Sequence, residues 1–278
     1  MDLHEVEKVF DEHWRQGWGS VFPAEIMVMQ DLIAEHRPRH FIEVGTASGL
    51  SGGFIARIME ENGGESFTTL DLFEEFFRDK SKPVGYLVER IYQGSAIRID
   101  LRPKTTALDL PAMGREFDMA FVDANHQHPY PTLDTLCLYP FLTGPRTVIH
   151  HDLKLYKEQD VPIGIGPKYL FDQVPEAYRS SSHVQRGNLF WLSLTMPREE
   201  LEALAIDSLL LPWSIRHEMR PRRIQQVREV LGAHYSTRLL DAFELALQRF
   251  NTSLAERTAV DGTADSQRRP SFLGRLLG

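Results

Sequence analysis

Acidic and histidine side chains gather in the stretch VDANHQHPYPTLDTLCLYPFLTGPRTVIHHDLKLY, which starts at Val122. Asp123 and His126 follow one short apolar run, and His151 and Asp152 follow the next. Carboxylate oxygens and imidazole nitrogens bind divalent cations, and an imidazole with a pKa near neutrality is a suitable general base. These residue types therefore predict a site that can bind a divalent cation such as Mg²⁺ or Mn²⁺ and can transfer a proton.

A second stretch, FIEVGTASGLSGGFIARIM, breaks a short apolar run with small residues and then resumes apolar residues at helical spacing. A glycine turn between a strand and a helix lets a ligand approach the backbone, and ligands of parallel sheets bind beyond the carboxyl ends of the strands. A P-loop would need Lys and then Ser or Thr after its last glycine, whereas Gly49 precedes Leu50 and Ser51. The pattern GxGxxG is also absent, which argues against a nicotinamide-dependent oxidoreductase. The turn is therefore predicted to form the floor of a small-molecule site that is neither a P-loop nor a dinucleotide site of the GxGxxG type.

Both stretches need a sheet to position them. From Arg39 to about Leu194, strand-like runs alternate with stretches of helical periodicity. Strands separated by helices predict βαβ units, and right-handed crossovers place the helices on both faces. The predicted fold is therefore α/β, with a doubly wound, mostly parallel sheet of the Rossmann-like type. The predicted strands are HFIEV, FTTLDL, AIRIDLR, DMAFVDA, RTVIH and NLFWLSL, and the helices between them include FIARIMEE, VGYLVERIY, YPTLDTLCLYPFL and a short one that begins at Pro167.

Helical patterns outside this core define the predicted domain organisation. Residues 1–38 are an N-terminal helical segment, residues 39–196 the α/β domain, and residues 197–256 an accessory C-terminal helical region whose last helix has one apolar face. Residues 257–278 are expected to be a disordered tail. The accessory helices are expected to shape a ligand pocket or to form a homo-oligomer contact.

The motif EVGTASG, with Glu43, Gly45 and Gly49, resembles the first motif of class I S-adenosylmethionine-dependent methyltransferases, E/D-x-G-x-x-x-G. In that family the second strand ends in an acidic residue that binds the two ribose hydroxyls, and TTLDL places Asp71 there. A carboxylate suits a vicinal diol because it accepts both hydroxyl protons. The run FDMAFVDANH is similar to the family's D-x-x-F-x-D-x-x-H form, so the resemblance extends over residues 39–194.

The resemblance implies S-adenosylmethionine as the cofactor. Its binding residues are expected at the strand ends, with the turn in LRPKTTALDL beside the adenine. The cofactor-binding set is predicted to be Glu43, Gly45, Thr46, Ala47, Ser48, Gly49, Ser51, Asp71, Leu72, Thr106 and Asp123.

The acceptor side looks like the metal-dependent branch of this family, the catechol-type and antibiotic-pathway sugar O-methyltransferases. By position, Asp123, His151 and Asp152 match its metal ligands, although that branch usually carries Asp or Asn where His151 stands. Three residues past the first ligand, catechol-type enzymes have a catalytic base, and His126 holds that position here. The resemblance implies methylation of a small-molecule or sugar hydroxyl, with Asp123 and His126 as catalytic residues. Related methyltransferases with a similar VDAxH…HD frame have no demonstrated need for metal, so a metal-free reaction stays open.

Two other functions remain compatible with the same fold. One is an enzyme of the cephalosporin-hydroxylase type, and the other is a non-catalytic relative that acts as a partner subunit. The tract Gly164-Ile165-Gly166-Pro167 is predicted to form part of a lid over the acceptor, with its glycines as hinges.

Composition restricts the partners and the location. The chain has 278 residues and a net charge of −8, which argues against a nucleic-acid binder. Its single cysteine, Cys137, permits no intramolecular disulfide and is compatible with the cytoplasm. No segment approaches the roughly 18 apolar residues of a membrane span. The sequence thus predicts a cytoplasmic enzyme with a small-molecule acceptor.

Overall fold

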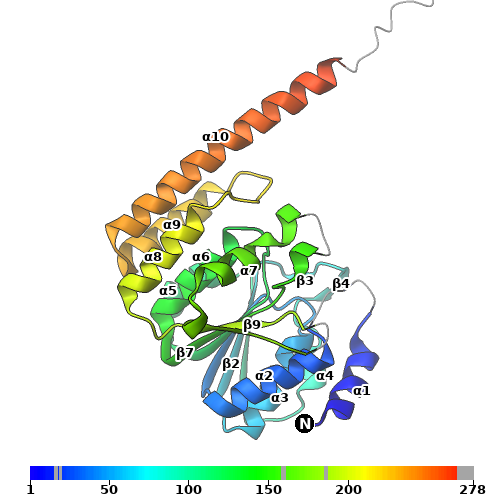
Figure 1. The fold of residues 1–278 in the computed structure, drawn as a ribbon. Helices are drawn as coiled ribbons and strands as arrows, with labels where there is room; N and C mark the ends of the chain where they lie inside the picture. Colours follow the sequence, from blue (N-terminus) through cyan, green and yellow to red (C-terminus); the bar gives the residue numbers. More distant parts are fainter. Residues whose placement is uncertain (16–17, 19–20, 158–160, 185–186, 268–278) are drawn as a thin grey trace, which may run out of the picture.

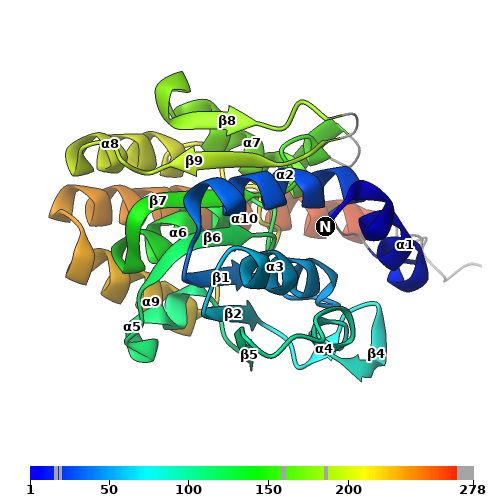
Figure 2. The same cartoon turned by 90° about the horizontal axis from the view of Figure 1, so that it is seen from below.

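A seven-stranded sheet forms the centre of the computed structural model, which describes residues 1–15, 18, 21–157, 161–184 and 187–267 (Figure 1). Its strands are β1 (His40–Val44), β2 (Ser66–Asp71), β5 (Arg98–Pro103), β6 (Phe117–Val122), β7 (Leu142–His150), β8 (Arg179–Ser181) and β9 (Phe190–Ser193). Their order is β5-β2-β1-β6-β7-β9-β8, which Figure 2 shows from β5 at the bottom to β8 at the top. Neighbours from β5 to β7 pair in parallel, whereas the β7–β9 and β8–β9 pairs are antiparallel. The predicted mostly parallel, Rossmann-like sheet is confirmed.

Helices cover both faces of the sheet (Figure 1). One face carries α1 (Leu3–His13), α2 (Pro23–His36), α3 (Leu50–Glu61) and α4 (Val88–Ile91), and the other carries α5 (Leu110–Met113), α6 (Tyr130–Leu138) and α7 (Val161–Gln173). Single 3₁₀ turns lie in the connections, at η1 (Ala107–Asp109), η2 (Tyr139–Phe141), η3 (Leu155–Lys157) and η4 (Glu176–Tyr178). No helix in the described ranges is long and apolar enough to cross a lipid bilayer.

Three C-terminal helices form an additional layer outside α6. They are α8 (Arg198–Leu209), α9 (Pro221–His234) and α10 (Thr237–Gln267), and α10 projects past the rest of the protein in Figure 1. Leu239, Phe243 and Phe250 of α10 pack with Trp213 and with Leu136 of α6 in one buried cluster. The predicted C-terminal helical region is therefore present, with α10 continuing beyond residue 256 into the expected tail, and residues 268–278 lie outside the described residues.

The side chains of β1 alternate between two hydrophobic cores, one on each face of the sheet. Phe41 packs on the α1–α4 side, with Val6 of α1 and Ile26 of α2, whereas Ile42 packs on the α6–α7 side. Because successive residues of a strand point to opposite faces, one short apolar run supplies both cores. The N-terminal helices thus share a core with the sheet, and α2 is held firmly beside it.

The structure corrects the predicted start of one helix. Helix α7 begins at Val161 and contains Pro167, whereas the sequence predicted that it begins at Pro167. Gly166 donates its N–H to His126 O at 2.9 Å, and Pro167 has no N–H to donate. The hydrogen-bond pattern of the helix is therefore already interrupted where the proline stands. A Cβ on Gly166 would lie 2.6 Å from His126 O. The tract at 164–167 is therefore a helical segment packed on the loop of His126, and its role as part of a lid over the acceptor stays a prediction.

A β-hairpin between β2 and α4 was not predicted. It consists of β3 (Glu75–Phe76) and β4 (Asp79–Pro83), which pair antiparallel in a separate two-stranded sheet. Its residues are mostly charged and alternate poorly, so neither β-propensity nor periodicity indicated it. The hairpin directly follows Asp71, where the sequence predicts the cofactor.

Candidate functional site

The glycine-rich turn after β1 is held against two neighbouring strands. Gly45 has a φ of +105° and donates its N–H to Leu70 O of β2 at 2.9 Å. A Cβ on Gly45 would lie 2.0 Å from the backbone oxygen of Asp123, which follows β6. Gly49 has a φ of +84° at the start of α3, where a Cβ would lie 2.6 Å from Val88. Glycine at 45 therefore lets the ends of β1 and β6 approach one another, and glycine at 49 lets the start of α3 pack against Val88 of α4.

Glu43 lies beneath this turn and is completely buried. Its two carboxyl oxygens each accept a hydroxyl hydrogen bond of 2.6 Å, from Ser51 and from Thr69. The Thr69 hydroxyl also lies 2.6 Å from the Thr46 hydroxyl. Burial raises the pKa of Glu43 to about 8 even though both hydrogen bonds favour the charged form. These contacts make Glu43, Thr46 and Ser51 a support for the turn from inside the protein.

Asp71, at the end of β2, holds the glycine-rich turn at Ala47. Its Oδ2 accepts the N–H of Ala47, which has a φ of +47°, and its Oδ1 accepts the N–H of Phe73, both at 2.9 Å. Each carboxylate oxygen keeps a further lone pair, which suits the two ribose hydroxyls expected there. Leu72 and Phe73, the next two residues in the chain, are 48 % and 56 % exposed. The end of β2 thus offers a carboxylate with an apolar rim.

Other predicted cofactor residues lie on the same edge in different settings. Ser48 is buried, and its backbone oxygen accepts the N–H of Leu87 at 3.0 Å. Thr106 begins η1 after β5, and its hydroxyl accepts a hydrogen bond from Arg223 of α9. That contact was not predicted, and it joins the accessory helices to the edge where the adenine is expected.

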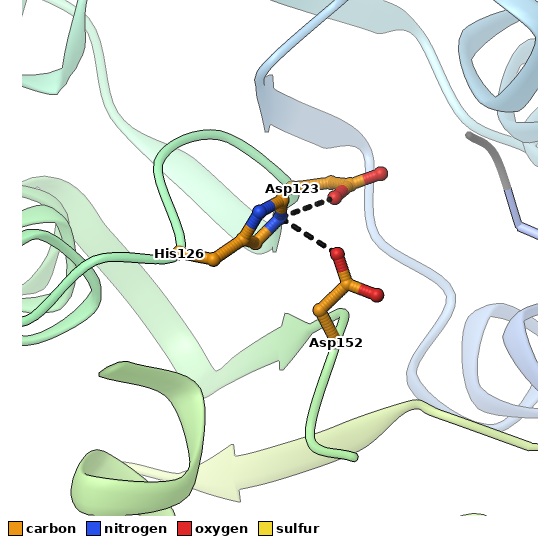
Figure 3. Close-up of side chains that lie close together, drawn as sticks. All are labelled: Asp123, His126 and Asp152. Atoms are coloured by element: carbon orange, nitrogen blue, oxygen red, sulfur yellow. Dashed lines mark hydrogen bonds and ion pairs between the residues drawn. The ribbon is translucent and has the colours of Figure 1, made fainter. Parts of the chain in front are cut away.

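On the acceptor side, the ends of β6 and β7 bring Asp123, His126 and Asp152 together (Figure 3). His126 Nε2 lies 2.8 Å from Asp152 Oδ2 and 3.3 Å from Asp123 Oδ1. His151 is nearly buried, and its Nδ1 lies 3.4 Å from Asp123 Oδ1 and 3.3 Å from Asp152 Oδ1. The structure therefore brings all four residues predicted for catalysis and metal binding into one cluster.

Charge pairing dominates the electrostatics of this cluster. Burial alone would lower the pKa of His126, but its hydrogen bonds to Asp123 and Asp152 and their charges outweigh burial and raise that pKa to about 9. Burial likewise opposes ionisation of the two carboxyls, yet His151 and His126 hold the pKa of both below its usual range. The same carboxylates raise the pKa of His151 well above its usual range despite its burial. The cluster thus pairs two carboxylates with two imidazolium groups near neutral pH.

Glu25 of α2 joins the cluster from the N-terminal segment. Its side chain is 1 % exposed, and its Oε2 lies 3.3 Å from His151 Nε2. Sequence reasoning missed Glu25, because the residue lies in the N-terminal helical segment, outside the predicted α/β domain. A signal was present, since an acidic residue in the first turn of the helix PAEIMVMQDLI stands beside otherwise apolar positions.

The donor set fits a divalent cation, which would take the place of the protons that the two imidazoles carry in the charge-paired cluster. Nε2 of His126 and one oxygen each of Asp123 and Asp152 lie within 4.8 Å of one another. Donors that bind one ion at about 2.1 Å lie roughly 3.0–3.4 Å apart, and the contacts in this cluster measure 2.8, 3.3, 3.3 and 3.4 Å. His151 Nδ1 faces the same two carboxylates at similar distances. On the cofactor side, the glycine turn and the remaining lone pairs of Asp71 fit a nucleoside with a free ribose diol.

Comparison with known proteins matches this core to one family. Residues 42–153, which are 112 of the 278 residues, match the family described as a methyltransferase domain. No curated protein matches the chain.

Several solved structures match part of this chain. The O-methyltransferase TomG from Streptomyces achromogenes, in complex with SAM, is 16 % identical, with a TM-score of 0.47 over 69 % of this chain and 88 % of that one. An O-methyltransferase from Bacillus cereus, in complex with SAH, is 18 % identical, with a TM-score of 0.46 over 68 % of this chain and 88 % of that one. The SAH-bound methyltransferase PaMTH1 from Podospora anserina is 12 % identical, with a TM-score of 0.43 over 83 % of this chain and 77 % of that one.

Proposed function

We propose that this chain is a class I, S-adenosylmethionine-dependent methyltransferase that methylates a hydroxyl group of a small molecule, and the match of residues 42–153 to a methyltransferase domain supports the proposal. One observation carries the proposal: a carboxylate suited to a ribose diol and a cluster suited to proton transfer lie on one edge of the sheet. Asp71 ends β2, and Asp123 follows β6, with β1 between these strands. Gly45 brings the two strand ends into contact, since its backbone packs on that of Asp123.

The cofactor residues act by orientation. When bound, S-adenosylmethionine supplies an electrophilic methyl group on a sulfonium, so the protein mainly has to align it with the acceptor. Asp71 is proposed to accept the ribose hydroxyls, and Gly45 and Gly49 to admit the cofactor to the backbone. Glu43, Thr46 and Ser51 are proposed to act indirectly, because their hydrogen bonds hold the turn from below.

The acceptor hydroxyl must lose its proton as it attacks the methyl group. His126 is proposed as the base, since its imidazole is 27 % exposed while its Nε2 contacts both carboxylates. Its pKa of about 9 means that most of the imidazole carries a proton at pH 7. The neutral form therefore grows as the pH rises toward 9, and the methyl-transfer rate should grow with it.

A divalent cation is the finer part of the proposal. Asp123, His151 and Asp152 would hold it, and a cation there lowers the pKa of a bound hydroxyl. A nitrogen donor beside two carboxylates suits Mn²⁺ and later transition metals better than Mg²⁺. A sugar or other small metabolite as acceptor, a homo-oligomer contact through the C-terminal helices and a cytoplasmic location remain predictions from the sequence.

Binding and turnover test this function separately. Calorimetry with S-adenosylmethionine should show saturable binding, and NAD should show none under the same conditions. Radiolabelled methyl transfer should then be screened across sugar nucleotides and phenols, with and without Mn²⁺. Absence of cofactor binding would reject the methyltransferase function. Cofactor binding without transfer to any nucleophile would favour the non-catalytic partner instead.

A further inference from the structure

Glu25 is a buried carboxylate with every contact inside the protein. Its Oε1 accepts the backbone N–H of Asn188 at 2.6 Å, and its Oε2 accepts the N–H of Phe22 at 2.8 Å. The same Oε2 lies 3.3 Å from His151 Nε2. A carboxylate with 1 % exposure is costly unless it is hydrogen-bonded and charge-paired, and His151 is the cationic partner in this set.

The contact with Glu25 determines how His151 faces the cluster. Of the two ring nitrogens of His151, Nε2 is the one that contacts Glu25. The other, Nδ1, therefore points to Asp123 and Asp152, at 3.4 and 3.3 Å. Histidines that bind metals commonly donate their second ring N–H to a carboxylate, which fixes both the tautomer and the ring orientation. Glu25 and His151 have this arrangement, with Nδ1 on the side of the two aspartates.

Asn188 provides a second connection from Glu25 to the same aspartate. Its backbone N–H donates to Glu25, and its side-chain Nδ2 donates to Asp152 Oδ1 at 2.7 Å. Asp152 has a φ of +66°, a left-handed conformation that is unfavourable for most residues with a side chain. Its Oδ1 is thus engaged by Asn188 and His151, while Oδ2 faces His126. Glu25 therefore orders both groups that hold Asp152.

We propose that Glu25 is a positioning residue for a divalent cation: it orients His151 so that Nδ1 completes a site with Asp123 and Asp152. The inference rests on the metal-assisted part of the proposed function. It gives the N-terminal helix α2 a role in the site, through a side chain 126 residues from His151 in sequence.

The test is a double-mutant cycle on Mn²⁺ affinity, measured by calorimetry and by the electron paramagnetic resonance signal of free Mn²⁺. The variants are Glu25→Gln, His151→Asn and the pair, because the Asn oxygen remains a metal donor but cannot contact Glu25 as the imidazole does. Glu35→Gln is the matched control, since Glu35 is exposed on the same helix. Thermal unfolding of each variant reports the purely structural contribution of Glu25.

Glu25→Gln should weaken Mn²⁺ binding by about 10–100-fold when His151 is present, the usual effect of losing an outer carboxylate. In the His151→Asn background the same change should cost less than about twofold, because glutamine keeps an oxygen that accepts the Asn188 N–H and the contact with the imidazole is already absent. Equal losses in both backgrounds, or no loss in either, would overturn the proposal. Absence of Mn²⁺ binding by the unmodified protein would also overturn it. S-adenosylmethionine affinity, measured on the same samples, tests the cofactor-binding part of the proposed function independently of the metal.

Discussion

The two halves of the site use carboxylates in opposite ways. On the cofactor side, Glu43 and Asp71 accept hydrogen bonds from hydroxyl and backbone N–H groups, which are uncharged donors. On the acceptor side, Asp123 and Asp152 pair with the imidazoles of His126 and His151. Carboxylates of the first kind shape the backbone, whereas those of the second kind hold charge that can be redistributed in a reaction.

This difference predicts that the cofactor side is fixed in shape and that the acceptor side can exchange protons. Neutral hydrogen bonds fix the turn at 45–49 at one geometry, which an alignment site requires. Charge pairs between side chains couple the protonation of each imidazole to its neighbouring carboxylates. Substitutions on the cofactor side should therefore change binding and stability, and those on the acceptor side should change rate.

His126→Asn should produce the largest effect and should break the acceptor side alone. Loss of the proposed base should lower the methyl-transfer rate by about two to four orders of magnitude, with cofactor affinity nearly unchanged. Single-turnover kinetics at saturating S-adenosylmethionine measure the rate, and calorimetry measures the affinity. The wild-type rate should rise with pH toward about 9, where burial is outweighed by the two aspartates, and the variant should lose that limb. A rate within a few-fold of wild type would show that the imidazole is structural.

Gly45→Ala should test the contact on which both sides depend. A Cβ there would lie 2.0 Å from Asp123 O, and the φ of +105° is strained for alanine. Strain and overpacking together should lower the free energy of unfolding by about 3–5 kcal/mol. Gly63→Ala is the control, because Gly63 has a φ of +81° but no heavy atom within 4 Å of an added Cβ. Equal destabilisation of the two variants in urea would contradict the contact.

The sequence predicted the site wherever local pattern was sufficient. Asp71 and Asp123 each follow an apolar run, so a strand with an acidic end could be recognised without knowing its neighbours. Glu25 and Asn188 could not be found this way, since 163 residues separate them and only tertiary packing joins them. The hydrogen bond from Gly166 to His126 could not be predicted either, because the periodicity of a segment does not show which backbone groups outside the segment it contacts.

Asp71→Ala should affect cofactor affinity more than rate. Loss of charge-assisted hydrogen bonds to the ribose should weaken S-adenosylmethionine binding by roughly 1.5–3 kcal/mol. Part of that loss would come from Ala47, whose N–H loses its acceptor. Calorimetry measures the affinity, with Asp79→Ala in the hairpin as a control that removes the same charge nearby. Unchanged affinity in a folded Asp71 variant would remove this residue from the cofactor site.

The smallest effect concerns Glu43 and the pH dependence of stability. Burial raises its pKa from 4.5 to about 8, so between these values the folded protein keeps a proton that the unfolded chain releases. The free energy of unfolding should therefore fall as the pH rises, by about 1.4 kcal/mol per pH unit from this group.

Asp134, whose pKa burial raises to about 7, and His126 contribute a slope of the same sign, so only the difference between wild type and Glu43→Gln isolates Glu43. Urea unfolding at pH 6 and pH 7 should show a smaller loss of stability in the variant, by about 1.4 kcal/mol. Identical slopes would mean that Glu43 is already ionised in the folded protein. The hydroxyls of Ser51 and Thr69 would then stabilise a buried charge, and the cofactor side would resemble the acceptor side after all.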